Sequence, residues 1–210
     1  MAIRALFLDF GNVFSTFHLE FFYRRLIKEG YTKLPAQELH RVQNEIYWPF
    51  DRGEISAGEY HRAFMARTDI EMSQELFEEF YTDIFFEDIA GLDVLLGRVR
   101  SDVVMYLLSN TNEVHYEKYF KKHPFLFKHI PAERHILSYR VRASKPDPRI
   151  YEYALKFAGV RPDEAILVDD YEANINGWKN TGGHGIVYHG FHHEIEALEE
   201  ELRRYAIVLK

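Results

Sequence analysis

Three short apolar runs, far apart in the chain, each end at a polar residue. They are residues 5–8 before Asp9, residues 103–108 before Ser109, and residues 165–168 before Asp169. Continuous apolar runs of this length are typical of strands that are buried on both faces. Because helical patterns lie between them, we predict an α/β fold with a Rossmann-like, three-layer core around a parallel sheet. The carboxyl ends of such strands share one edge, so we expect the three polar residues to meet there.

The chain between the first two runs has a different pattern. Residues from about 18 to 88 have helical spacing, broken at Pro49 and Gly53, and we expect no strand of useful length there. Ser56 and Glu59 have the spacing of a capping box, and Ser73 is placed to begin a helix over residues 74–85. Weaker strands are expected at residues 134–139 and 185–188. We therefore predict a core from residues 1–14 and 92–210, with a helical cap from residues 15–91.

Composition narrows the possible chemistry. The 210 residues include no cysteine, which excludes disulfides, thiol nucleophiles and thiolate metal sites. Any metal must be held by oxygen or imidazole, and this favours a hard cation such as Mg²⁺.

Charge and hydropathy bear on partners and location. The formal net charge is -7 and no basic block occurs, which disfavours nucleic-acid binding. No apolar run approaches the roughly 20 residues of a membrane span, and the first strand pattern begins almost at Met1. We therefore expect no membrane association and a cytoplasmic location.

Two of the strand ends carry groups that could bind a phosphate and its counterion. The Asp9 carboxylate follows a buried strand, where it needs a cation or hydrogen-bond donors, although it could also simply cap the next turn. Ser109 and Asn110 would offer a hydroxyl and backbone amides to an anion, although Ser and Asn are also ordinary helix N-caps.

A lysine and a pair of acids complete the set of candidates. Lys145 precedes Pro146, which restricts its backbone to extended conformations and so orients the ammonium group. Asp169 and Asp170 follow the last buried run. Since Mg²⁺ takes one or two carboxylates together with substrate oxygens, Asp9 and one acid of this pair would suffice to hold it.

Together these segments resemble the four motifs of the haloacid dehalogenase-like hydrolase superfamily, in order and in spacing. The segments are Asp9-Phe10-Gly11-Asn12-Val13, Ser109-Asn110, Lys145-Pro146-Asp147-Pro148, and Asp169-Asp170 with Asn174. The turn at residues 52–56 also resembles the subgroup whose cap lies between the first and second motifs.

The resemblance implies covalent phosphoryl transfer to Asp9 from a small phosphorylated substrate. Magnesium would be bound by Asp9, the Gly11 carbonyl and an acid of the pair, with Asp170 preferred over Asp169 because of its spacing to Asn174. Ser109, the Asn110 amide and Lys145 would hold the phosphate. Asn174 stands where many relatives have an acid, and it could orient a metal-bound water.

One position departs from the family pattern. Phosphatases of the superfamily usually have a second aspartate, as general acid, where this chain has Gly11. Three functions remain open. The first is a phosphatase for sugar 1-phosphates or acyl phosphates, whose leaving oxygens need little protonation; the others are a 2-haloacid dehalogenase and a non-catalytic phosphate-binding or regulatory protein. Since general acid catalysis is worth about 10²–10⁴ in rate, we expect Gly11→Asp to raise turnover.

Further candidates for the site are less specific. Phe14, Trp48 and Arg52 could contact the leaving group, or could be cap core and a solvated arginine. His18 could replace the missing acid, although it could equally decorate the start of a helix. Three histidines near the C-terminal end of the chain could bind a transition metal, or they could be ordinary surface residues. They are His189, His192 and His193.

Overall fold

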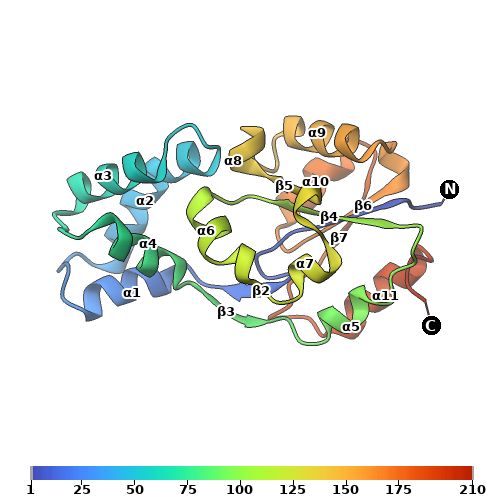
Figure 1. Cartoon of the computed structure of the whole chain (residues 1–210), viewed down its shortest axis with the longest axis horizontal. Coiled ribbons are helices and arrows are strands. Elements are labelled where there is room, and N and C mark those ends of the chain that lie inside the picture. Colours follow the sequence, from blue (N-terminus) through green and yellow to red (C-terminus); the bar gives the residue numbers. More distant parts are fainter. Residues whose placement is uncertain (1, 210) are drawn as a thin grey trace.

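The computed structural model describes residues 2–209, and its centre is a five-stranded sheet (Figure 1). The strand order is β5-β4-β1-β6-β7, and every neighbouring pair is parallel. The strands are β1 (Ala5–Leu8), β4 (Val104–Ser109), β5 (His135–Leu137), β6 (Ala165–Asp169) and β7 (His184–Val187). The predicted fold class and all five predicted core strands are confirmed.

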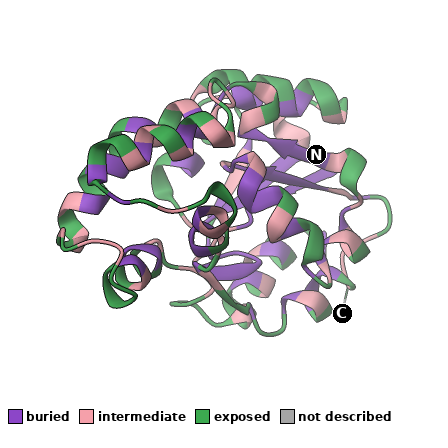
Figure 2. Cartoon of the chain, turned by 60° about the vertical axis from the view of Figure 1, so that its left-hand side comes forward, coloured by how far each residue is buried: buried purple, intermediate pink, exposed green. Residues whose placement is uncertain are grey.

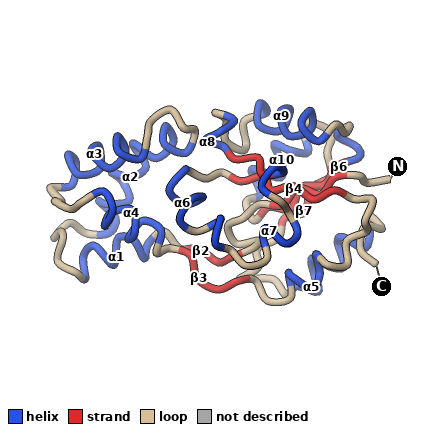
Figure 3. Tube along the Cα trace, viewed as in Figure 1, coloured by secondary structure: helices blue, strands red, loops and turns tan. Residues whose placement is uncertain are grey.

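Helices cover both faces of this sheet (Figure 3). Strand β1 is fully buried, and its side chains alternate between the two sides: Leu6 and Leu8 belong to one apolar cluster, Ala5 and Phe7 to the other. The helices of the first side are α5 (Leu92–Leu96), α6 (Glu113–Lys118), α7 (Leu126–His129) and α11 (Ile195–Arg204). Those of the second side are α9 (Pro148–Ala158) and α10 (Glu172–Lys179). The short helix α8 (Ser138–Val141) follows β5.

Four further helices form a cap at one end of the sheet, at the left of Figure 1. They are α1 (Glu20–Lys28), α2 (Ala36–Asp51), α3 (Ala57–Thr68) and α4 (Gln74–Thr82). Ser56 and Glu59 form the predicted capping box, and Ser73 caps α4. The cap helices bury a separate, largely aromatic cluster that includes Phe22, Tyr60 and Tyr81. Figure 2 shows buried residues along the cap helices and in the central strands of the sheet.

Two details of the cap differ from the sequence prediction. A small antiparallel ribbon joins β2 (Ser15–Phe17) to β3 (Phe85–Asp88), where only helix was expected. Both strands are too short to produce a periodic pattern, and they lie about 70 residues apart in the chain. In addition, Pro49 lies inside α2, which continues to Asp51 instead of ending at the proline. The ribbon lies where the chain enters and leaves the cap, and we propose that the cap spans residues 15–91.

None of the helices within residues 2–209 combines the length and the apolar character that a membrane span requires.

Candidate active site

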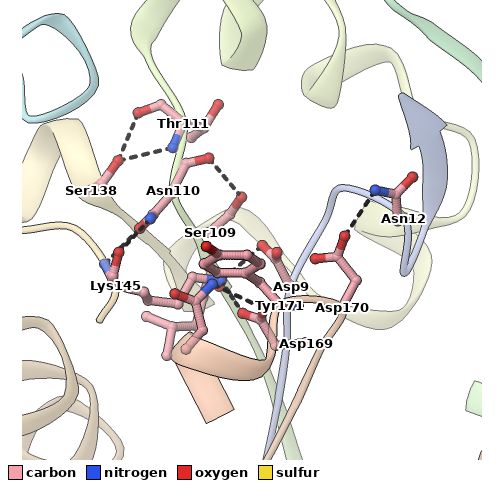
Figure 4. A network of polar contacts seen from close by, with 12 residues as sticks. Asp9, Asn12, Ser109, Asn110, Thr111, Ser138, Lys145, Asp169, Asp170 and Tyr171 are labelled. Atoms are coloured by element: carbon pink, nitrogen blue, oxygen red, sulfur yellow. Dashed lines mark hydrogen bonds and ion pairs between the residues drawn. The ribbon is translucent and has the colours of Figure 1, made fainter. Parts of the chain in front are cut away.

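Three neighbouring strands bring their terminal polar residues together (Figure 4). Asp9 follows β1, while Ser109 and Asp169 end β4 and β6, which flank β1 in the sheet. Lys145 reaches into this group from the loop before α9. Its Nζ lies 3.0 Å from Asp9 Oδ1 and 2.6 Å from Asp169 Oδ2, and it donates a hydrogen bond to the Leu108 carbonyl oxygen at 2.8 Å. The parallel sheet therefore builds the predicted cluster.

Burial and charge act against each other in this cluster. Burial raises the pKa of the Asp9 carboxyl, and the Lys145 ammonium only partly opposes this effect. Burial alone would lower the pKa of Lys145, yet Asp169 and Asp9 together hold it well above its usual value. Lys145 is therefore a permanent cation, and a second cation beside Asp9 would further stabilise the charged carboxylate.

The two adjacent acids have different surroundings. Asp169 is fully buried and both of its oxygens are engaged: Oδ2 with Lys145, and Oδ1 with the Tyr171 N–H and the Asn174 amide, each at 2.9 Å. Asp170 borders the cavity above Asp9, and its Oδ2 accepts a hydrogen bond from the Asn12 side chain at 2.8 Å. Burial also raises the pKa of Asp170. Of the pair, Asp170 is the acid that is free to bind a cation.

These donors fit a magnesium ion. Oxygens of Asp9, Asp169 and Asp170 lie within 4.8 Å of one another, and Gly11 lines the same cavity. A set made only of carboxylate and carbonyl oxygens suits a hard cation such as Mg²⁺. Because Asp169 is already saturated, Asp9, Asp170 and the Gly11 carbonyl are the groups that would hold it.

The loop after β4 forms the other side of the site. The Asn110 side chain is bonded at both ends to the Lys145 backbone, donating to its carbonyl oxygen at 2.8 Å and accepting from its N–H at 2.7 Å. This pair fixes the Lys145 loop against the β4 loop. The Ser109 hydroxyl donates only a long hydrogen bond, 3.4 Å, to the Asn110 carbonyl oxygen, so it could still turn toward an anion. Thr111 also lines the cavity, and its buried hydroxyl has no partner in the described structure. The sequence run Ser-Asn-Thr-Asn contained this residue, but only its first two members were predicted as site residues.

Comparison with known proteins agrees with this geometry. A model of the haloacid dehalogenase-like hydrolase family matches residues 3–182, most of the chain. The chain belongs to this family. A curated relative, D-ribitol-5-phosphate phosphatase from Bacteroides thetaiotaomicron, is 28% identical over 185 residues, which cover 86% of this chain and 89% of that protein.

Solved structures share the fold of this hydrolase. A HAD family enzyme from Bacteroides thetaiotaomicron, in complex with magnesium and inorganic phosphate, is 24% identical with a TM-score of 0.76, over 88% of this chain and 93% of that one. A HAD-like family hydrolase from Porphyromonas gingivalis is 20% identical with a TM-score of 0.81, over 97% and 99% of the two chains.

A cavity of about 510 Å³ lies above Asp9, between the core and the cap of the hydrolase. Lys145, Ser109, Asn110, Asp170 and Asn174 all line it, as do Tyr47 and Trp48 of α2 and Tyr81 of α4. Its volume is within the usual range for small-molecule sites. Of the candidates for contacts with the leaving group, Trp48 is the one that reaches the cavity.

The other candidate contacts lie elsewhere. Phe14 is fully buried in the core, stacked on Phe10 with ring centroids 5.8 Å apart. Arg52 pairs with Glu54, and His18 is exposed in an aromatic group outside the cavity. The structure therefore does not bring Phe14, Arg52 or His18 to the site.

The histidines after β7 do not form a metal site. Among the histidines, aspartates and glutamates of residues 2–209, one group has three or more side chains close enough together to hold an ion. It consists of Asp9, Asp169 and Asp170. His189 Nε2 lies 4.0 Å from Asp170 Oδ2, and the His189 backbone N–H donates to His193 Nδ1. His192 stacks near His189, with ring centroids 4.3 Å apart.

A buried carboxylate that the sequence did not single out connects the cap to the core. Asp51, at the end of α2, accepts hydrogen bonds from the Tyr47 hydroxyl at 3.1 Å and the Ser144 hydroxyl at 2.9 Å. Its backbone carbonyl lies 2.7 Å from the Ser138 Oγ. Burial raises the pKa of Asp51 to about 6, while the hydrogen bond from Ser144 opposes the shift. This network holds the cap against the Lys145 loop.

Proposed function

We propose that this hydrolase is a Mg²⁺-dependent phosphatase that forms an aspartyl phosphate on Asp9. The observation that carries the proposal is the position of Asp9, which lies between the Lys145 ammonium and the Asp170 carboxylate in a cavity between the core and the cap. The phosphatase name of the curated relative supports the same reaction.

In the proposed reaction, a carboxylate oxygen of Asp9 attacks phosphorus. The bond from phosphorus to the leaving oxygen breaks, and its electron pair leaves with that oxygen. Water then attacks phosphorus, and the bond from phosphorus to the Asp9 oxygen breaks. Its electron pair restores the Asp9 carboxylate, and both protons of the water leave with the inorganic phosphate. This route replaces one difficult displacement by two easier ones.

The residues around Asp9 have complementary roles. Lys145, Ser109 and the backbone amide of Asn110 hold the transferred phosphoryl group and stabilise its charge. Asp170 and the Gly11 carbonyl would hold a metal ion beside Asp9, with Asn12 orienting Asp170. Such an ion would supply positive charge that stabilises the transferred group. Asn174 acts through Asp169, which it holds in place against Lys145.

The leaving group must depart without a strong general acid. Gly11 has no side chain that could donate a proton. The Phe17 ring occupies the space beside it and lies 2.8 Å from where a Cβ of residue 11 would be. His115 also lines the cavity, but both of its nitrogens are engaged, and burial lowers its pKa to about 4. This favours substrates whose leaving oxygen is weakly basic, namely acyl phosphates and sugar 1-phosphates, over primary alkyl phosphates.

The two other functions left open by the sequence have less support. Metal-independent dehalogenation has no use for Asp170, a free acid beside Asp9. A non-catalytic role leaves unexplained why Lys145 and Asp9 are kept together in a cavity that also holds Asp170.

The test is phosphate release from acetyl phosphate and α-D-glucose 1-phosphate, with Mg²⁺ and with EDTA. We expect phosphate release with Mg²⁺ but not with EDTA, and we expect Asp9→Asn to abolish it. Release that persists in Asp9→Asn would contradict the proposal, and so would chloride release from 2-chloropropionate without metal.

A further inference from the structure

The part of the cavity lining that the cap and the β2–β3 ribbon contribute is largely apolar. Among the described residues that line the cavity, the only charged side chains are Asp9, Lys145 and Asp170, all at the transfer site. The lining there comes from the cap helices, from the β2–β3 ribbon and from two residues in the turns between them: Phe17, Leu19, Trp48, Tyr81, Ile84 and Phe85. We call these six residues the apolar wall.

Polar groups beside the apolar wall are already used within the protein. The Tyr47 hydroxyl donates to Asp51 at 3.1 Å, and the Tyr81 hydroxyl is within 3.4 Å of the Asn112 amide. His115 bonds Asn112 through Nδ1 and the Tyr81 carbonyl oxygen through Nε2. Apart from the unpartnered Thr111 hydroxyl, a sugar or polyol would find few partners here for its several hydroxyls, and burying them unpaired is unfavourable. A flat apolar group would instead pack against the aromatic rings of the wall.

We propose that the substrate is an acyl phosphate whose organic part is a flat, mainly apolar group, and that Trp48 is a specificity-determining residue for it. This inference rests on the proposed phosphatase function and narrows its substrate class. An acyl phosphate satisfies the two demands of the site together. Its carboxylate leaves without a proton donor, and its apolar group fills the space beside the wall. The cavity of about 510 Å³ has room for one small ring.

The test compares benzoyl phosphate with acetyl phosphate, with an enzyme-free blank for each. The two leaving carboxylates are similar in basicity, so the ratio of the two kcat/KM values reports contacts with the organic group. We expect benzoyl phosphate to be preferred by about tenfold or more. Equal values, or a preference for acetyl phosphate, would overturn the inference.

Variants of Trp48 locate the source of the preference. We expect Trp48→Ala to reduce the benzoyl-to-acetyl ratio toward one and Trp48→Phe to retain most of it. Phe157→Ala is the matched control, since Phe157 and Trp48 are both 46% exposed and Phe157 lies on α9 outside the cavity. A ratio that Trp48→Ala leaves unchanged would contradict the role of Trp48.

The assay also separates the inference from the function on which it rests. Metal-dependent turnover of acetyl phosphate or α-D-glucose 1-phosphate without a benzoyl preference would overturn the inference alone. No metal-dependent turnover of any of the three substrates by folded enzyme would overturn the proposed function as well.

Discussion

The Asp51 carboxylate of the cap accepts a hydrogen bond from the Ser144 hydroxyl of the core at 2.9 Å. Ser144 directly precedes Lys145, whose ammonium group lies between Asp9 and Asp169. The cap is therefore connected to the charged centre by one buried carboxylate, which is fully shielded from solvent. Two consequences can be measured, one for this carboxylate and one for the lysine.

Asp51→Asn should change how stability depends on pH. The pKa of Asp51 is raised to about 6 from a usual 3.8, so the folded protein holds this proton more tightly than the unfolded chain does. The stabilisation from this group is complete below about pH 4 and is lost as the pH rises through about 6. The free energy of unfolding of Asp51→Asn, relative to wild type, should thus rise by on the order of 3 kcal/mol between about pH 4 and 8. Urea titrations at several pH values measure this, and a pH-independent difference would argue against it.

Lys145→Met should lower the stability of the folded enzyme and abolish its activity. The substitution leaves the Asp9 and Asp169 carboxylates buried without their cation, which typically costs about 3–5 kcal/mol. Lys121→Met is the control, because Lys121 forms an exposed pair with Glu117 and should leave stability and activity near wild type. The denaturant concentration at the midpoint of unfolding measures the loss of stability, and phosphate release measures the loss of activity. A Lys145→Met protein as stable as Lys121→Met would contradict the electrostatic account.

Gly11→Asp should not raise turnover by itself, contrary to the expectation from the sequence. The new Cβ would lie 2.8 Å from the Phe17 ring, and displacing that ring should cost about 1–3 kcal/mol of stability. We expect Gly11→Asp to be less active than wild type on p-nitrophenyl phosphate, and Gly11→Asp/Phe17→Ala to recover activity over the single variant. Phe17→Ala alone is the reference. If Gly11→Asp alone is faster than wild type, the ring does not restrict this position.

Asp170→Asn and Asp169→Asn should have different effects. Asp170→Asn should raise the Mg²⁺ concentration that gives half-maximal activity by about tenfold or more. The metal-free variant should be as stable as the metal-free wild type. Removing the Asp169 charge breaks its ion pair with Lys145 and should lower the stability of the metal-free protein. Magnesium titrations and melting curves in EDTA separate the two. Equal effects on both readouts would mean that the two acids share one role.

The fold could be predicted where a pattern is local. The apolar runs that became β1, β4 and β6 are continuous, and each is followed by a polar residue at the same edge of the sheet. The β2–β3 ribbon depends on pairing between Ser15–Phe17 and Phe85–Asp88, which no local pattern reveals. The ring of Phe85 fits the end of an amphipathic helix equally well, so that helix was extended too far.

The residues of the site likewise divide into those that the sequence predicted and those that depend on contacts distant in the chain. Asp9, Ser109 and Asp170 could be predicted because the sheet places strand ends side by side, and Lys145 because Lys145-Pro146 resembles the third motif of the family. Asp51 could not, because its core partners Ser138 and Ser144 are set by how the cap docks on the core, and the contact with Tyr47, one turn earlier on α2, does not by itself mark a buried acid.

The most direct test of the central claim is mass spectrometry of enzyme that is quenched in acid during turnover of acetyl phosphate with Mg²⁺. The account predicts a phosphoryl group on Asp9, lost in the Asp9→Asn variant and in EDTA. Turnover at full rate with the phosphoryl group on another residue, or with none on the protein, would contradict it.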